Sequence, residues 1–200
     1  MTDKKINSAP RVAPAFRVGG GVSRWVGQTI LGLMGWRVEG EPPNVAKCVI
    51  IASPHTSNWD LILAFGTILS RGMPIRFMMK KEAFFFPFGG LFKRLGGMPI
   101  DRSSRNNVVE QMAKAFSDAD VLWVAITPEG TRGDIKAYRK GYLRIAEAAD
   151  VPVFLFGVDA PRKTLVLDRY METTGDDAAD AAAHLAYVTA NYTGMKPRGR

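Results

Sequence analysis

Short apolar runs alternate with amphipathic helical patterns along most of this chain. The runs are short enough for buried strands and cover residues 48–53, 75–79, 121–127, 153–158 and 164–167. Apolar residues that recur every three or four positions predict helices at 58–70, 106–116, 138–149 and 176–192. Strands that alternate with helices predict an α/β fold, with helices flanking a mainly parallel central sheet.

A further helical pattern lies between Val22 and Met34, ahead of the first strand. Its apolar stripe either packs on the core or lies at a membrane interface, and Trp25 and Trp36 favour the membrane. A bilayer-spanning helix needs ~20 mostly apolar residues, which this glycine-rich segment lacks. We therefore divide the chain into an N-terminal tail with an amphipathic helix, residues 1–37, and a main domain, residues 38–200.

The composition restricts the kinds of function open to the chain. Its 200 residues are 46% hydrophobic, enough for one domain with a buried core. A net charge of +8 favours phosphate-bearing partners, on lipids, cofactors or nucleic acid. One cysteine and two histidines exclude an internal disulfide, and we expect no metal site. No apolar signal segment is present, so we expect a cytoplasmic protein.

The stretch Pro54–Asp60, "PHTSNWD", combines a histidine with an acid five residues later, just after a predicted strand. Ser57 and Asp60 have the spacing of a capping box, so Asp60 could serve only the start of a helix. Alternatively, an acid in the first helical turn orients His55 on the preceding loop, and the imidazole then acts as a general base. The local pattern leaves both roles open.

A second polar stretch, "ITPEGTRG", follows the predicted strand at 121–127. Ligands of open α/β sheets bind at the carboxyl ends of the strands, where Glu129, Gly130, Thr131 and Arg132 should lie. An arginine can bind a phosphate through two hydrogen bonds, and glycine lets the backbone approach a ligand closely. An ordinary polar turn explains the same residues. The stretch "GGMPIDR" places another arginine, Arg102, beyond a short apolar segment.

Two clusters flank these stretches. The segment 80–97 combines phenylalanines with lysines, which suits either an anionic membrane surface or a buried core with a basic edge. The basic residues Lys136, Arg139, Lys140 and Arg144 form either a solvated face or a site for donor phosphates.

Four blocks in order make the chain resemble the glycerolipid acyltransferase family, which includes the lysophosphatidic acid acyltransferases. Residues 55–60 resemble its H-x4-D block, 97–102 its second block and 128–132 its P-E-G-T-R block. Residues 151–153 resemble the proline-containing start of the fourth. The resemblance covers roughly residues 45–160 and implies a glycerol-phosphate acyltransferase-like fold.

The resemblance implies an O-acyltransferase of phospholipid biosynthesis. His55 and Asp60 would be catalytic, and Arg102, Glu129, Gly130, Thr131 and Arg132 would bind the acceptor. The acceptor would be a lysophospholipid, foremost 1-acylglycerol-3-phosphate. The donor would be acyl-CoA or acyl carrier protein, with no other cofactor and no metal. We expect peripheral association with the anionic inner face of the membrane, and no nucleic acid partner.

Other functions remain open at this stage. The acceptor could be another lipid, such as lyso-ornithine lipid, or the same base could activate water in a hydrolase. A noncatalytic basic protein that binds membranes or nucleic acid would explain the charge and the aromatic residues, but no helix-turn-helix, RNP or zinc-finger pattern is present.

Overall fold

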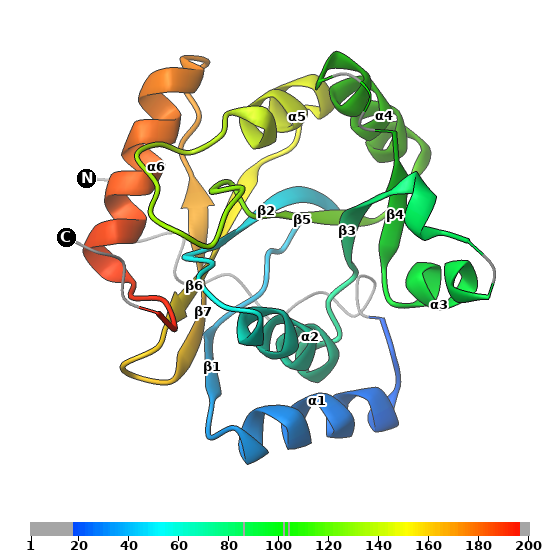
Figure 1. The fold of residues 1–200 in the computed structure, drawn as a ribbon, viewed down its shortest axis with the longest axis vertical. Coiled ribbons are helices and arrows are strands. Elements are labelled where there is room, and N and C mark those ends of the chain that lie inside the picture. The colour runs from blue at the N-terminus through cyan, green and yellow to red at the C-terminus, as the bar shows by residue number, and fades with distance from the viewer. Residues whose placement is uncertain (1–17, 86, 102, 104, 197–200) are drawn as a thin grey trace.

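A seven-stranded sheet runs through the middle of the molecule (Figure 1). The computed structural model describes residues 18–85, 87–101, 103 and 105–196. The strand order is β1-β7-β6-β2-β5-β3-β4. The strands are β1 (Arg37–Gly40), β2 (Lys47–Ser53), β3 (Ile75–Lys80), β4 (Gly97–Ile100), β5 (Leu122–Ile126), β6 (Val153–Asp159) and β7 (Thr164–Met171).

The sheet is mostly parallel, as predicted. β2 pairs in parallel with β5 and β6, and β3 pairs in parallel with β4 and β5. Among the strand pairs of the described residues, β6 with β7 is the antiparallel one, and β7 then pairs in parallel with β1. The two strands at this edge therefore run opposite to the other five.

Helices cover both faces of the sheet (Figure 1). They are α1 (Gly21–Leu33), α2 (Trp59–Arg71), α3 (Phe88–Arg94), α4 (Arg105–Asp118), α5 (Gly141–Ala149) and α6 (Asp177–Asn191), with a short 3-10 turn at Lys81–Ala83. Side chains alternate along β2, so Val49 and Ile51 join the core beneath α4, α5 and α6. Cys48 and Ile50 join the core on the α1 and α2 side. The predicted α/β architecture is confirmed.

The predicted strands and helices are present, with shifts at their ends. α5 begins at Gly141, three residues later than predicted, because the preceding residues form a turn in which the Arg139 N–H donates to the Pro128 carbonyl oxygen, 2.8 Å away. β1, β4 and α3 were not predicted as separate elements. β1 and β4 have four residues each and contain glycine or charged side chains, so their apolar pattern is too short to recognise.

The N-terminal helix α1 packs on α2 and still exposes apolar side chains. Gly27 and Leu31 are its buried residues, and the following Trp36 is 8% exposed and lies in the core. Trp36 therefore belongs to the core and does not support the membrane alternative for this segment. Trp25, in contrast, is 65% exposed, and Val22 and Leu33 are more exposed still. No helix in the described part of the chain is long and apolar enough to cross a membrane.

Candidate active site

The two polar stretches singled out in the sequence meet at one edge of the sheet. His55 follows β2, and Glu129 to Arg132 follow β5. Because β2 and β5 pair in parallel, their carboxyl ends lie at the same edge and their loops lie side by side. This is the edge at which ligands of open α/β sheets bind.

His55 and Asp60 face one another. The Nδ1 atom of His55 lies 3.1 Å from Oδ2 of Asp60, and the side chains are 22% and 6% exposed. A carboxylate beside Nδ1 keeps the imidazole proton on that nitrogen, so Nε2 carries the lone pair. The arrangement matches that of a general base and the acid that orients it.

Asp60 also serves the start of α2, so the two roles left open by the sequence coexist. Its Oδ2 atom accepts the backbone N–H groups of Thr56 and Ser57, each at 2.7 Å. The bond from Ser57 is the reciprocal half of a capping box, while the Ser57 hydroxyl accepts the Trp59 N–H instead. One buried oxygen therefore fixes both the helix start and the histidine.

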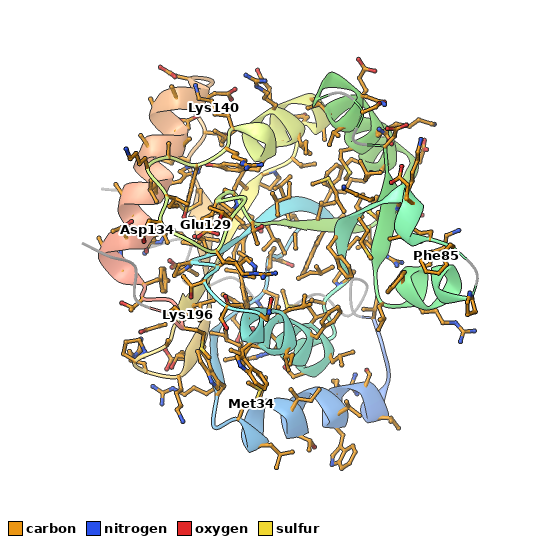
Figure 2. All side chains as sticks on the ribbon, in the orientation of Figure 1. Met34, Phe85, Glu129, Asp134, Lys140 and Lys196 are labelled. Atoms are coloured by element: carbon orange, nitrogen blue, oxygen red, sulfur yellow. The ribbon has the colours of Figure 1, made fainter. Side chains whose placement is uncertain are left out.

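Glu129 lies behind the histidine and away from the cavity wall. The carboxylate is 3% exposed, and its Oε1 atom accepts the backbone N–H of His55 at 3.0 Å and the Ser53 hydroxyl at 2.6 Å. Figure 2 shows Glu129 in the interior of the molecule. This position does not support the predicted contact with the acceptor, because the carboxylate is already committed to the His55 loop. Glu129 joins the two motif stretches to each other.

A tyrosine that the sequence analysis did not single out extends this network. Ser53 and Tyr138 are both buried, and their hydroxyl oxygens lie 2.6 Å apart. Since Ser53 gives its single proton to the Glu129 carboxylate, Tyr138 is the donor to Ser53. Tyr138 lies at the start of a predicted helix, and no local pattern marks its hydroxyl as part of a site.

A cavity of about 910 Å³ opens beside His55 and Asp60. One part is apolar and lies between α2 and the sheet, where it is lined by Ala64, Phe65, Ile68, Phe77, Phe156 and Val158. The other part is polar and is lined by His55, Gly130, Thr131, Arg132 and Arg139. The volume suits a small-molecule site, and the two parts suit an amphipathic ligand.

Two guanidinium groups provide the positive charge of the polar part. Neither Arg132 nor Arg139 forms an ion pair within the described residues, so both are open to an anionic ligand. Gly130 has φ 64°, and a side chain there would collide with Arg139. Glycine therefore allows the tight turn and lets Arg139 cross over it. The sequence assigned Arg139 to a basic cluster without placing it at the site.

The rest of that basic cluster lies elsewhere. Arg144 forms an ion pair with Asp177 of α6 at 3.1 Å. Lys136 and Lys140 line a separate groove of about 620 Å³ against α6. The structure thus divides the cluster, and Arg139 is the member that reaches the main cavity.

The predicted site residue Arg102 lies outside the described residues. The carboxylate of its neighbour Asp101 accepts a hydrogen bond from the Lys81 ammonium at 2.7 Å and another from the Ser103 N–H at 2.9 Å. The bond from Lys81, followed by that from Ser103, lowers the pKa of Asp101 to about 2. Gln111 of α4 donates to the Asp101 carbonyl and accepts its N–H. The chain next to Arg102 is therefore anchored to the 3-10 turn at Lys81–Ala83 and to α4.

Two other kinds of site depend on the side chains present: a cysteine nucleophile and a metal-binding cluster. Cys48 is fully buried, and burial raises the pKa of its thiol, so the reactive thiolate is disfavoured. The described residues contain no group of three histidine, cysteine, aspartate or glutamate side chains placed to hold a metal ion.

Comparisons with known proteins bear on the family and the fold. A family model described as Acyltransferase matches residues 36–157, more than half of the chain. A search of solved structures finds the crystal structure of the 1-acyl-sn-glycerophosphate (LPA) acyltransferase PlsC from Thermotoga maritima. The TM-score is 0.60 at 16% sequence identity, and the match covers 84% of this chain and 76% of that one. No curated protein matches the chain in the sequence search.

We predict that Glu129→Ala destabilises the protein by roughly 2 kcal/mol, because it leaves the Ser53 hydroxyl and the His55 N–H buried without their acceptor. Urea denaturation measures this change. Glu147→Ala, which removes an exposed carboxylate from α5, serves as the control and should stay within about 0.5 kcal/mol of the parent. Equal stability of the two variants would show that the buried network does not form in solution.

Proposed function

The chain belongs to the acyltransferase family, and we propose that it transfers a fatty acyl group from a thioester to the hydroxyl of a lysophospholipid. The donor would be acyl-CoA or acyl carrier protein, and the acceptor 1-acylglycerol-3-phosphate. The observation that carries the proposal is the His55–Asp60 pair, which lines one cavity together with apolar side chains and two arginines.

His55 acts as the general base in this reaction. Its Nε2 takes the proton of the acceptor hydroxyl while the oxygen attacks the thioester carbonyl carbon. The carbon–sulfur bond of the thioester then breaks as the new ester forms, and the leaving sulfur takes the proton from Nε2 and departs as a thiol, which restores the neutral imidazole. Asp60, 3.1 Å from Nδ1, stabilises the protonated ring. Base catalysis of this kind is worth about 10²–10⁴-fold.

The two parts of the cavity suit the two ends of the substrates. Arg132 and Arg139 would hold phosphate groups, of the acceptor head or of the donor, and Gly130 and Thr131 line the same cavity. An acyl chain fits between α2 and the sheet, against Phe65 and Phe77. Holding both substrates beside His55 lowers the entropic part of the barrier.

A hydrolase is the chemical alternative, since the same base could activate water. The cationic wall favours transfer if it holds an acceptor phosphate, whereas a wall that holds only donor phosphates would suit either reaction. An assay that follows a labelled acyl group separates the two reactions. Label in the lipid product supports transfer, and label released only as free fatty acid supports hydrolysis.

We also propose that the protein binds peripherally to the anionic inner face of a membrane. Val22, Trp25 and Leu33 project from the side of α1 that does not pack on α2. Three more exposed apolar residues, Trp59, Leu61 and Ile62, lie in the first turn of α2. Leu61 also lines the cavity, so the cavity reaches this apolar surface. The net charge of +8 favours anionic lipids.

The phenylalanine segment contributes less surface than its sequence indicates. Phe84 and Phe92 pack edge to face, with ring centroids 6.1 Å apart, whereas Phe85 is 58% exposed and projects from the molecule (Figure 2). Phe84 and Phe92 are thus partly buried against each other, and Phe85 is an exposed phenylalanine that could contact a membrane.

We predict that His55→Ala lowers transfer at least 10²-fold with an unchanged circular dichroism spectrum. Radiolabelled acyl-CoA with separation of the lipids by thin-layer chromatography measures the loss. Asn58→Ala, an exposed position in the same loop whose side chain caps nothing, should keep normal activity. Normal turnover by His55→Ala would remove the proposed base.

We predict that Arg132→Ala raises KM for a phosphate-bearing acceptor by about 10- to 100-fold, because the variant loses one charge-assisted hydrogen bond to the phosphate. Lys136→Ala, a cation of the same loop outside the main cavity, is the matched control. Arg139→Ala shows which substrate the Arg139 guanidinium binds: KM for that substrate, acceptor or donor, should rise. An unchanged acceptor KM in Arg132→Ala contradicts the assignment of Arg132.

We predict that replacing Trp25 and Leu33 with serine weakens binding to vesicles of phosphatidylglycerol and phosphatidylethanolamine at least tenfold, because both side chains lose apolar contact with lipid. Cosedimentation measures the bound fraction. Gln28→Ser, an exposed polar position on the same helix, is the control. Full binding by the double variant would exclude α1 as the membrane contact.

A further inference from the structure

The end of the described chain returns to the loop that carries the histidine. The backbone N–H of Lys196 donates to Oγ1 of Thr56 at 3.0 Å, and Thr56 is 2% exposed. Gly194 is so close that a methyl group there would lie 2.6 Å from both Oγ1 and Cγ2 of Thr56. Figure 2 labels Lys196 at this end of the chain. We call residues 193–196 the C-terminal segment.

The C-terminal segment is held in place at both ends. At its start, the Thr193 carbonyl accepts the Ala160 N–H at 2.8 Å, and the preceding Tyr192 donates its hydroxyl to Asp168 at 2.7 Å. Near its end, Met195 packs against the core on the α1 and α2 side. These contacts fix the segment to β6, β7 and the core, so it presents a rigid surface to Thr56.

Thr56 connects the C-terminal segment to Asp60 and His55. Its own N–H donates to Oδ2 of Asp60 at 2.7 Å, and the same oxygen lies 3.1 Å from Nδ1 of His55. A chain of contacts therefore leads from Lys196 through Thr56 to Asp60 and His55. We propose that the C-terminal segment positions His55 for catalysis, an inference that rests on the proposed function. The segment lies outside residues 36–157, which the family model matches.

His55 needs such support because residues 54–57 belong to no helix or strand. The Glu129 carboxylate accepts the His55 N–H, and Asp60 accepts the N–H groups of the next two residues, Thr56 and Ser57. The Thr56 side chain is fixed by the C-terminal segment, which does not line the cavity. A shift of about 1 Å in a reacting group can cost 10²-fold in rate, so loss of this contact should lower kcat and leave KM unchanged.

Three variants and one control test the contact. Thr56→Val keeps the shape of the side chain and removes the acceptor, whereas Thr56→Ser keeps a hydroxyl. Gly194→Ala adds a methyl group directly against Thr56, at a position whose φ is outside the left-handed region. Gly32→Ala on α1, where a methyl group meets nothing within 4 Å, is the matched control. We expect Thr56→Val and Gly194→Ala to lower kcat about tenfold at constant KM, and the other two to behave as the parent.

Nuclear magnetic resonance of the full chain labelled with ¹⁵N-histidine separates positioning from general destabilisation, because the chain has two histidines. His184 is buried between the Tyr142 hydroxyl and the Glu172 carbonyl, each 2.7 Å from a ring nitrogen, and serves as the internal reference. We expect Thr56→Val and Gly194→Ala to change the His55 ring signals and leave those of His184 unchanged.

Two results would overturn the inference: unchanged His55 signals together with an unchanged kcat, or equal changes at both histidines. The spectra require no turnover. If the parent shows no acyl transfer, the proposed function fails while the spectra still decide whether the C-terminal segment positions His55.

Discussion

Two buried carboxylates hold an irregular loop in place, and the site depends on them. Asp60 accepts the N–H groups of Thr56 and Ser57, and Glu129 accepts that of His55. A buried charge is costly unless several donors satisfy it, and the backbone of this loop supplies those donors. The loop also depends on the carboxylates, because its buried N–H groups have no helix or strand partner and need acceptors. The imidazole therefore sits on a backbone that is fixed at three consecutive residues.

This arrangement explains why two distant stretches of sequence act as one site. Parallel pairing of β2 with β5 brings their carboxyl ends together, and Glu129 then bonds directly to the histidine loop. Within the second stretch the residues divide their roles. Glu129 points inward as support, while Gly130, Thr131 and Arg132 face the cavity. The order of the residues in P-E-G-T-R thus separates structural from ligand-facing positions.

The cavity and the surface beside it fit a ligand that is apolar at one end and anionic at the other. The apolar part lies between α2 and the sheet, and Arg132, Arg139 and His55 line the polar part of the same cavity. Exposed apolar residues at the start of α2 adjoin the cavity through Leu61. A lipid that enters from a membrane would need no long passage through water, which is the physical advantage of this placement.

The sequence by itself determined the strands with long apolar runs, the helices with clear periodicity and the carboxyl-end location of the two polar stretches, because these follow from local spacing. It also left Asp60 with two candidate roles, and the structure shows one oxygen in contact with both the Ser57 N–H and the His55 ring. Only the tertiary structure decided that Glu129 is buried, that Tyr138 and Ser53 extend its network, that Arg139 reaches the cavity and that Trp36 is core. Each of these depends on a contact between residues far apart in the chain, and the spacing of residues along a sequence carries no information about such contacts.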